Sequence, residues 1–458
     1  MSSGVVAQRG KARRIPIHRT LPRFVTNPYA VLDEVGREAG GEVVRLELGL
    51  FRPYLLTHPD HVQRVLRDNS DNYIRGGRFW RPLRHLFGDG ILGEDGNGWE
   101  HSRKTLQPSF TRKYLDSLLV RIGEAVHAAV EELDGAALSG VPLDVGEEMR
   151  RIVSRTAVEV LFADQISAAD ARRVVEAVDT IGTSVVLRMS LGVAAKSVPV
   201  PGDRAYWRAV RTVDEVMVPL VRQAQRGPTD GTDILAILSR ARGEDGGELT
   251  DAQVRDDIVA MFVTANETTS VMLTWLWPVL QAHPEVAQRL YDEVDRVVGG
   301  RPIQHAEVAE LNYTQAVLDE LLRLYPAAWI FTRLVRRADV VGGVPIKGGS
   351  TVLLSPYITH KLPQFWDRAG DFDPERFLAS RRARLHRYAY FPFGGGPHQC
   401  IGKYFYQLKA QVIVATILSR YRPTLDGGGI PRPAVAASLR PGRRIEMTLS
   451  PVERRLAA

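Results

Sequence analysis

One long helix constrains the fold of this 458-residue chain more than any other feature. Thr250, followed three residues later by Gln253, forms a capping-box pattern that is typical of a helix N-terminus. Apolar residues then recur with helical periodicity as far as about His283. A helix of this length can cross a whole domain, so we expect a large domain that contains it.

The rest of the pattern is also mainly helical. Length alone allows about three domains, but the Gly-, Pro- and Asp-rich breaks are short enough to be loops within one domain. Hydrophobic residues at 44% and charged residues at 25% are typical of a globular protein with a substantial core. We therefore expect a mainly α fold with small β-sheets. Further helices are expected at 285–298, 313–324 and 403–421, and strands at 43–48, 54–57 and 351–355.

The composition excludes several classes of site. A single cysteine cannot form an internal disulfide, a CxxC redox pair or a multi-thiolate iron–sulfur cluster, and it favours a reducing, cytoplasmic environment. The N-terminal segment has no apolar stretch behind its basic residues, so we expect no signal peptide and no integral membrane association. The net charge of +7 is modest and the arginines are scattered, so we do not expect nucleic-acid binding.

The single cysteine lies in the most informative stretch of the chain, residues 393–402, which reads FGGGPHQCIG. Three consecutive glycines allow the backbone to approach a flat ligand closely. Cys400 lies where the helix at 403–421 is expected to begin, and free amides with the positive end of the helix dipole favour a thiolate there. These residues alone leave an alternative open, because a lone cysteine is more often a small buried apolar residue.

This stretch resembles the haem-binding loop of the cytochrome P-450 family, F-x-x-G-x-[HR]-x-C-x-G. The residues in register are Phe393, Gly396, His398, Cys400 and Gly402. The resemblance implies a single triangular haem domain at 26–458 behind a basic, partly flexible tail at 1–25. It also implies that Cys400 ligates the iron of haem b (heme b, iron protoporphyrin IX). The protein would be a monooxygenase that inserts one atom of O2 into a largely apolar small molecule.

Two further family signatures follow the expected order along the chain. Glu320 and Arg323 match E-x-x-R, although their spacing on one helix face would also suit an ordinary surface pair. The segment FDPERF at 372–377 resembles the PERF segment of the family, and its arginine is Arg376. The resemblance implies that these three residues form a buried structural triad, in which loss of one member would leave an unpaired buried charge.

The resemblance also suggests contacts to the haem propionates. Trp99 to Arg103 is similar to the W-x-x-x-R of a helix that crosses above one propionate, which implies that Arg103 binds it. Arg333 and His398 occupy positions at which the family often has further propionate ligands. Each of these residues taken alone could be an ordinary solvated charge.

The long helix carries polar residues in an apolar context, since 263–269 reads VTANETT. In isolation, the threonine hydroxyls would bond back to carbonyls of the preceding turn and Glu267 would face solvent. The family has [AG]-G-x-[DE]-T-[TS] in this helix, which implies that Glu267 and Thr268 relay protons during oxygen activation. Thr264 and Ala265 depart from the small residue and the glycine of that motif, so we expect the helix kink and the adjacent pocket to differ.

No flavin or nicotinamide fingerprint precedes a helix, so electrons from NAD(P)H must arrive through separate redox partners. The resemblance suggests a ferredoxin and a ferredoxin reductase, docking on the cysteine side of a monomeric enzyme. The positive charges expected there are Arg103, Arg112, Lys113, Lys403 and Lys409.

Two other functions and the substrate stay open at this point. A peroxide-driven peroxygenase is disfavoured by the intact acid–alcohol pair, and a non-enzymatic haem sensor or carrier would use the same loop. The segment 322–357 is similar to bacterial terpenoid-oxidising members, which suggests secondary metabolism, with macrocyclic or peptide substrates as the alternative. The expected pocket walls are mainly apolar: Phe79, Trp80, Phe87, Val263, Thr264, Trp329 to Phe331, Ser438 and Leu439.

Overall fold

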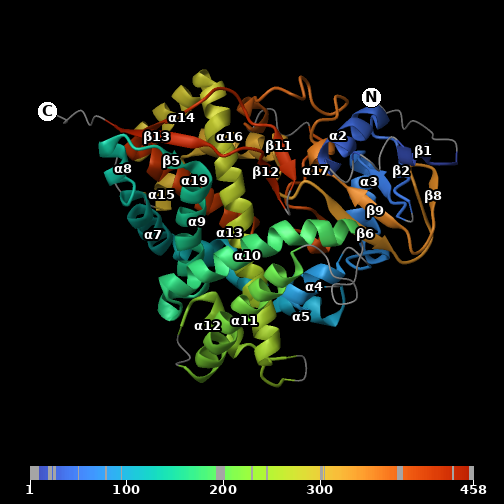
Figure 1. Ribbon diagram of the computed structural model, residues 1–458, viewed down its shortest axis with the longest axis horizontal. Coiled ribbons are helices and arrows are strands. Elements are labelled where there is room, and N and C mark those ends of the chain that lie inside the picture. The colour runs from blue at the N-terminus through green and yellow to red at the C-terminus, as the bar shows by residue number, and fades with distance from the viewer. Residues whose placement is uncertain are drawn as a thin grey trace.

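The longest helix of the computed structural model, α13 (Asp251–Ala282), runs through the centre of the molecule (Figure 1). The structure describes residues 10–18, 23, 27–49, 51–77, 80–93, 95–191, 202–227, 231–243, 246–299, 303, 305–378, 385–435 and 438–452. The Thr250 hydroxyl accepts from the Gln253 amide at 3.3 Å, and the Gln253 side chain accepts from the Thr250 amide at 2.9 Å. The predicted capping box and the predicted long helix are therefore both confirmed.

Other helices pack around α13. The helix α9 (Val145–Leu161) lies along it, while α10 (Ala168–Leu191) and α11 (Asp203–Arg226) pack on each other and on α13 (Figure 1). The other longer helices are α2 (Pro28–Ala39), α5 (Asn97–Leu106), α7 (Leu119–Glu131), α14 (Pro284–Val297), α16 (Asn312–Leu324) and α19 (Lys403–Arg420). The shorter ones are α3 (Pro59–Gln63), α4 (Arg81–Phe87), α6 (Arg112–Ser117), α8 (Asp134–Ser139), α12 (Ile234–Arg240), α15 (His305–Val308) and α17 (Pro356–Thr359).

The largest sheet has the strand order β1-β2-β3-β9-β6-β4. Its strands are β1 (Arg13–Ile15), β2 (Val44–Leu46), β3 (Tyr54–Leu56), β4 (Tyr73–Ile74), β6 (Phe331–Val335) and β9 (Thr351–Leu354). The predicted strands correspond to β2, β3 and β9. The strand β1 lies within the segment expected to be a tail, and it pairs in parallel with β2.

Three smaller sheets complete the described strands. One joins β5 (Leu143–Asp144), β10 (Tyr421–Leu425) and β13 (Glu446–Pro451), and another pairs β7 (Asp339–Val341) with β8 (Val344–Ile346). The third is the hairpin of β11 (Pro433–Val435) and β12 (Leu439–Pro441), which packs against α13. The expectation of a mainly α fold with small sheets is confirmed.

The main core lies between the helices. Trp275 of α13 is fully buried there, stacks on Tyr325 with ring centroids 4.3 Å apart, and donates from Nε1 to the Leu439 carbonyl at 2.7 Å. Burying an indole with its N–H satisfied fixes the distance between α13 and the β11–β12 hairpin. This contact places the hairpin beside the part of α13 that carries the polar motif.

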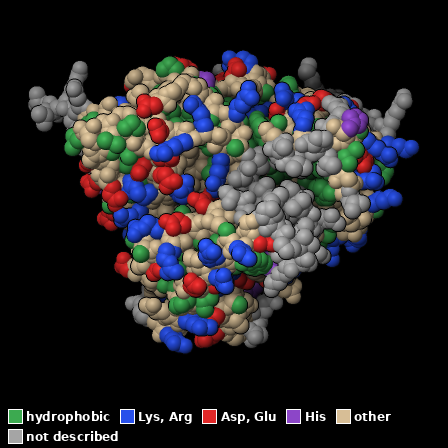
Figure 2. Space-filling model, in the orientation of Figure 1, with side chains coloured by type: hydrophobic (Ala, Val, Ile, Leu, Met, Phe, Trp, Pro, Cys, Tyr) green, Lys and Arg blue, Asp and Glu red, His purple; other side chains and the backbone are tan. Residues whose placement is uncertain are grey.

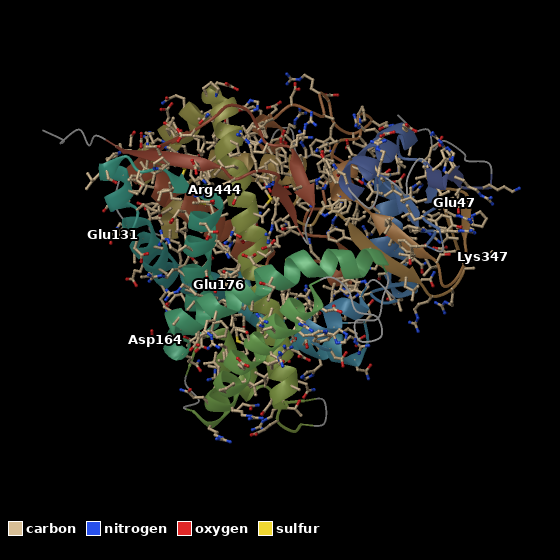
Figure 3. The ribbon with its side chains drawn as sticks, in the orientation of Figure 1. Glu47, Glu131, Asp164, Glu176, Lys347 and Arg444 are labelled. Carbon is tan, nitrogen blue, oxygen red and sulfur yellow. The ribbon has the colours of Figure 1, made fainter. Side chains whose placement is uncertain are left out.

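The surface mixes charges of both signs. On the face drawn in Figure 2, Lys and Arg side chains alternate with Asp and Glu side chains. Figure 3 shows Glu131 and Glu176 on the helical side of the molecule and Glu47 and Lys347 beside the large sheet. Within the described residues, none of the helices is both long and apolar enough to cross a membrane.

Candidate active site

The loop before α19 folds back on itself around Cys400. The Cys400 amide donates to the Phe393 carbonyl at 2.9 Å, which closes the loop at its two ends. Gly396 has a φ of 64°, and a Cβ there would lie 1.7 Å from the Leu66 carbonyl oxygen. Two features of this position therefore require glycine: the left-handed backbone conformation and the close packing on residues 64–68.

Cys400 lies inside the protein but keeps accessible side-chain surface. Burial raises the pKa of its thiol, while the Gly402 amide and the positive charges of Arg103 and Lys403 act in the opposite direction. The helix α19 begins only at Lys403, after Gly402, so the cysteine precedes the helix cap by two residues. The expected stabilisation of the thiolate by the helix is thus outweighed by burial, and a bound cation would reverse that balance.

Three arginines gather on the side of this loop. Arg75 follows β4 and donates to the Ile91 carbonyl at 2.9 Å and to Nδ1 of His398 at 2.8 Å. Burial, followed by repulsion from Arg333, lowers the pKa of Arg75 to about 9. Burial likewise lowers the pKa of Arg333, on β6, to about 10. The third member, Arg103 of α5, donates to the Gln399 carbonyl at 2.8 Å and its pKa is also lowered by burial.

Within the described part of the chain, one carboxylate serves this cluster. Asp95 lies 3.9 Å from the guanidinium of Arg75 and 3.3 Å from Nε2 of His398. Burial alone would raise the pKa of Asp95, but the hydrogen bonds from His398 and from the Arg75 amide hold it below its usual range. Trp99 packs on His398 with ring centroids 4.0 Å apart. Three buried or half-buried guanidinium groups with one carboxylate form a site suited to added anionic groups.

Glu320 and Arg323 of α16 are both fully buried, which excludes the alternative of a surface pair. Arg323 donates from Nε and Nη2 to the two carboxylate oxygens of Glu320 at 2.6 and 2.7 Å. Arg376, in the turn Pro374–Phe377, places Nε 3.4 Å from Oε1 of Glu320. Arg323 also donates to the carbonyls of His360, Ala369 and Asp371. The three residues that the motifs predicted to meet are therefore in contact, and Arg376 joins the pair on α16 from a segment more distant in sequence.

Sequence comparison identifies the group to which this architecture belongs. The family described as Cytochrome P450 matches residues 10–447. The chain belongs to the cytochrome P450 family. Pentalenene oxygenase of Streptomyces avermitilis is 30% identical over 412 residues, covering 90% of this chain and 91% of the relative. Cyclooctat-9-en-7-ol 5-monooxygenase of Streptomyces melanosporofaciens is 32% identical over 387 residues, covering 84% and 83%. The crystal structure of the cytochrome P450DA haem domain superposes with a TM-score of 0.87 at 21% identity, over 97% of this chain and 99% of that chain, which shows the shared fold.

This P450 is therefore an oxygen-incorporating oxidoreductase that binds haem b and takes electrons from NAD(P)H through redox partners. The arginine cluster fits that cofactor, because haem b carries propionate groups that would neutralise buried guanidinium charges. Arg75 and Asp95 belong to the cluster but were missed from the sequence. Arg75 occupies no recognised motif, and its partner His398 lies 323 residues away.

In the P450, the polar motif of α13 forms local hydrogen bonds. Thr268 donates from Oγ1 to the Thr264 carbonyl at 2.8 Å, and Thr264 donates from Oγ1 to the Ala260 carbonyl at 2.7 Å. These back-bonds are those expected for threonines in an ordinary helix. Each hydroxyl oxygen keeps lone pairs with which it can accept a further hydrogen bond.

Glu267 of this P450 does not simply face solvent. Arg440, on β12, donates from Nη2 to both of its carboxylate oxygens at 2.7 and 2.8 Å, and the Ser438 hydroxyl also donates to it. Arg440 donates in addition to Asp179 of α10 at 3.1 Å. The acid of the motif is thus ionically tied to the β11–β12 hairpin and to α10. Arg440 was missed from the sequence because 173 residues separate it from Glu267.

Replacing Arg440 with methionine should lower the free energy of unfolding by about 1–3 kcal/mol at neutral pH, because Glu267 then loses its guanidinium partner and Asp179 keeps only Arg150, at 3.5 Å. Equilibrium unfolding in urea measures the change. The double variant Arg440→Met/Glu267→Gln should recover part of the loss, since the unpaired charge of Glu267 is gone. An Arg440→Met protein as stable as the wild type would contradict this account of the network.

The expected pocket walls of the P450 occupy three different surroundings. Phe87 and Val263 lie at the edge of the main core, each 8% exposed. Trp329 and Leu439 pack together in the cluster beneath the large sheet, and Phe331 lies 6.2 Å from Phe391 between ring centroids. Trp80 lies near Arg75, whereas Phe79 falls outside the described residues. Ser438 is buried and donates a hydrogen bond to Glu267, so this expected pocket residue lies next to the acid of the α13 motif.

Proposed function

We propose that this cytoplasmic P450 oxidises a cyclic terpenoid at an apolar carbon, by C–H hydroxylation or a related reaction. The observation that carries the proposal is the junction of α19 and α13. Cys400 lies just before α19, and α19 packs on α13 beside the turn that carries Glu267 and Thr268. A cysteine that would ligate the iron, together with groups on α13 that would supply protons, suits oxygen activation.

The terpenoid class is supported by the activities for which the two Streptomyces relatives are named, one of which is a pentalenene oxygenase. Mainly apolar candidate walls agree with an apolar substrate. The test is a titration of sesquiterpenes and diterpenes, with cyclic peptides as the comparison set, followed by the Soret band of the haem. A shift given by terpenoids at micromolar concentration is expected. A shift given by cyclic peptides alone would overturn the substrate class.

Five side chains are proposed to hold the cofactor. Cys400 ligates the iron, while Arg75, Arg103 and Arg333 neutralise the propionates. His398, packed under Trp99 and bound to Asp95, orients them. When bound, the haem supplies the iron centre at which O2 is activated with two external electrons. Phe393, Gly396 and Gly402 shape the loop around the cysteine.

Thr268 is proposed to hold the proton that the reaction consumes, with Glu267 as the acid behind it. The Thr268 hydroxyl can rotate away from the Thr264 carbonyl and donate to another acceptor. Glu267 is engaged by Arg440 and Ser438, so protons reach it through the Ser438 hydroxyl or after the ion pair opens. The pair therefore serves O2-dependent turnover better than direct use of peroxide, which favours a monooxygenase over a peroxygenase.

Thr268→Ala should uncouple the enzyme. Haem binding and oxygen uptake should stay largely intact while reducing equivalents form hydrogen peroxide, because proton delivery often contributes about 10²- to 10⁴-fold. Product and peroxide per NADPH, measured with surrogate redox partners, give the result. Thr268→Ser is the matched control and should keep more of the coupling. A wild-type product yield in Thr268→Ala would show that another group delivers the proton, and Thr264 would be the next residue to test.

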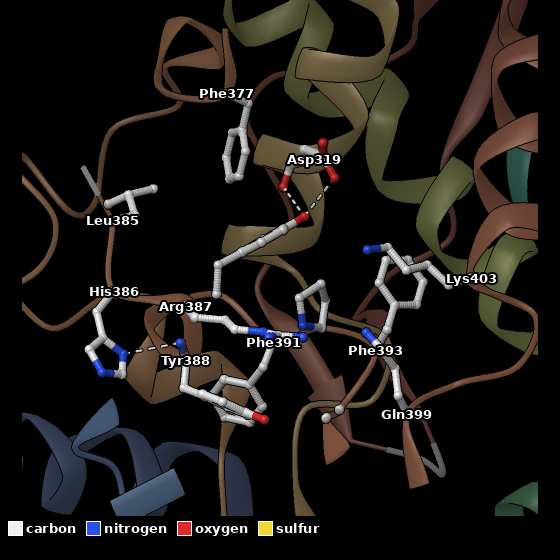
Figure 4. A pocket seen from close by; sticks show the side chains of 14 residues that line it. Asp319, Phe377, Leu385, His386, Arg387, Tyr388, Phe391, Phe393, Gln399 and Lys403 are labelled. Atoms are coloured by element: carbon white, nitrogen blue, oxygen red, sulfur yellow. Dashed lines mark hydrogen bonds between the residues drawn. The ribbon is translucent and has the colours of Figure 1, made fainter. Parts of the chain in front are cut away.

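The redox partner is proposed to be a ferredoxin, reduced by its reductase, that docks on a monomeric enzyme on the cysteine side. A cavity of about 230 Å³ lies there. Arg387, Phe393, Gln399 and Lys403 are among the residues that line it (Figure 4). Arg112 and Lys113 are exposed on α6, and the guanidinium of Arg112 lies 4.8 Å from the ring centroid of Tyr404, the neighbour of Lys403. Exposed positive charge around a concave surface attracts an acidic partner. Lys409 was expected to belong to this surface, but this assignment is wrong, because Lys409 is fully buried.

A further inference from the structure

The side chain of Lys409 lies in the protein interior with 0% exposure, between α19 and α13. Its Nζ donates to the Ala265 carbonyl at 2.7 Å and lies 4.7 Å from the centroid of the Phe405 ring. The described residues provide no ion pair for it in the structure. Burying an ammonium group without a carboxylate costs several kcal/mol, so a lysine kept in such a place needs an explanation.

The contact point of Lys409 is the turn that carries the relay residue. Lys409 bonds to the carbonyl of Ala265, and Thr268 bonds to the neighbouring carbonyl of Thr264. In an α-helix the Ala265 carbonyl also accepts from the amide four residues later. The ammonium of Lys409 is thus a second, charged donor to a carbonyl within the unbroken helix α13. Asn266 in the same turn donates to the Phe262 carbonyl, and its buried Oδ1 has no hydrogen-bond partner.

We propose that Lys409 is a positioning residue for proton delivery, whose ammonium group holds the turn of α13 from which Thr268 presents its hydroxyl. The proposal rests on the relay role given to Thr268 above. Lys409 acts through the Ala265 carbonyl, so it needs no contact with substrate. Phe405 on the same side of α19 keeps the ammonium away from water and strengthens its hydrogen bond.

The charge of Lys409 changes near neutral pH, because burial lowers the pKa of its amine to about 7. Above that pH the amine is neutral and a weaker donor, so the turn is held less firmly. Buried titratable groups on the helices around α19 are engaged elsewhere. On α13, Glu267 is bound by Arg440, and Asp257 accepts from the Ile91 amide. On α16, Asp319 accepts from Tyr390, and Glu320 is paired with Arg323 and Arg376. On α19 itself, Tyr406 is a neutral phenol without a hydrogen-bond partner.

A stability measurement tests the buried amine without any turnover. Between pH 7 and the ordinary pKa of lysine, the unfolded chain holds a proton that the folded chain lacks, so stability rises with pH in this window. Relative to Lys409→Met, the unfolding equilibrium constant of the wild type should therefore fall by up to about tenfold per pH unit above pH 7. A difference between the two proteins that does not change with pH would show that Lys409 stays charged, and would overturn the pH-dependent part of the proposal.

The function is tested on the haem-loaded full-length enzyme with surrogate ferredoxin and reductase and no added substrate. The readout is the fraction of consumed O2 recovered as H2O2, which takes two electrons and two protons, against water, which takes four of each. In the wild type this fraction should rise severalfold from pH 6.5 to 8.5. Lys409→Met should give a high, pH-independent fraction, and Lys409→Arg, which stays charged, a low and pH-independent one.

Thr268→Ala in the same assay separates the two proposals. If Thr268→Ala raises the H2O2 fraction but Lys409→Met behaves as the wild type, the relay stands and the role of Lys409 is refuted. If Thr268→Ala leaves the fraction unchanged, the relay itself fails. Should Lys409→Met not bind haem, Lys409→Arg decides alone, because a wild-type pH profile in that variant would exclude control by the lysine charge.

Discussion

Cys400→His should abolish the red-shifted Soret band of the reduced carbon monoxide complex. The band depends on a thiolate ligand to the haem iron, and the chain contains no other cysteine that could replace Cys400. Oxygenation should fall to background, because an imidazole does not push electron density toward oxygen as a thiolate does. The spectrum of the dithionite-reduced, carbon monoxide-saturated protein gives the answer directly.

Cys400→Ser is the companion variant, and it should also lose oxygenation because serine is too basic and too hard to replace a thiolate. Haem content and far-UV circular dichroism show whether each variant is folded. A folded Cys400→His protein with an unchanged Soret band would rule out Cys400 as the iron ligand. The loop closure by the Cys400 amide uses only backbone, so neither substitution removes it.

Arg323→Ala should yield protein with little bound haem and a free energy of unfolding reduced by about 3–5 kcal/mol, because it leaves Glu320 buried without its main partner. It also frees the carbonyls of His360, Ala369 and Asp371, which hold the segment before the PERF turn. Haem-to-protein absorbance ratio and urea unfolding measure the two effects. Glu320→Ala should act in the same direction.

The matched control is Arg222→Ala, which breaks an ion pair to Asp251 in which both side chains are exposed. Its cost should stay below about 1 kcal/mol, with normal haem content. Normal haem content in Arg323→Ala would refute the scaffold role of the triad. Loss of activity alone would not distinguish a scaffold from a catalytic group.

The helices were largely predictable because their signals are local. Thr250 and Gln253 mark the start of α13, and Glu320 with Arg323 identified α16 as the helix of the buried pair. The partners that complete the site come from distant segments. Neither the bond from Arg75 to His398 nor that from Arg440 to Glu267 can be predicted from sequence periodicity, because each forms only when separate elements pack together.

The prediction for Lys409 was wrong for a different reason. Its charge suggested a surface position, yet Phe405, Leu408 and Val412 on the same helix are all buried, so it interrupts an apolar stretch. That interruption was a readable signal for a buried lysine. The short strands β1, β4 and β6 were overlooked because each is brief or carries arginines, and their pairing partners rather than their own sequence define them.

The position of β1 has a practical consequence for how the chain is expressed and trimmed. Ile15 is buried, while Arg13 and Arg14 are exposed on the outermost strand of the sheet. A short, charged border strand of this kind protects a sheet from joining another one edge to edge. Truncation through Ile15 would expose the backbone of β2 and invite self-association. The same sheet carries Arg333, so edge-to-edge association of this sheet would disturb a residue of the proposed haem site.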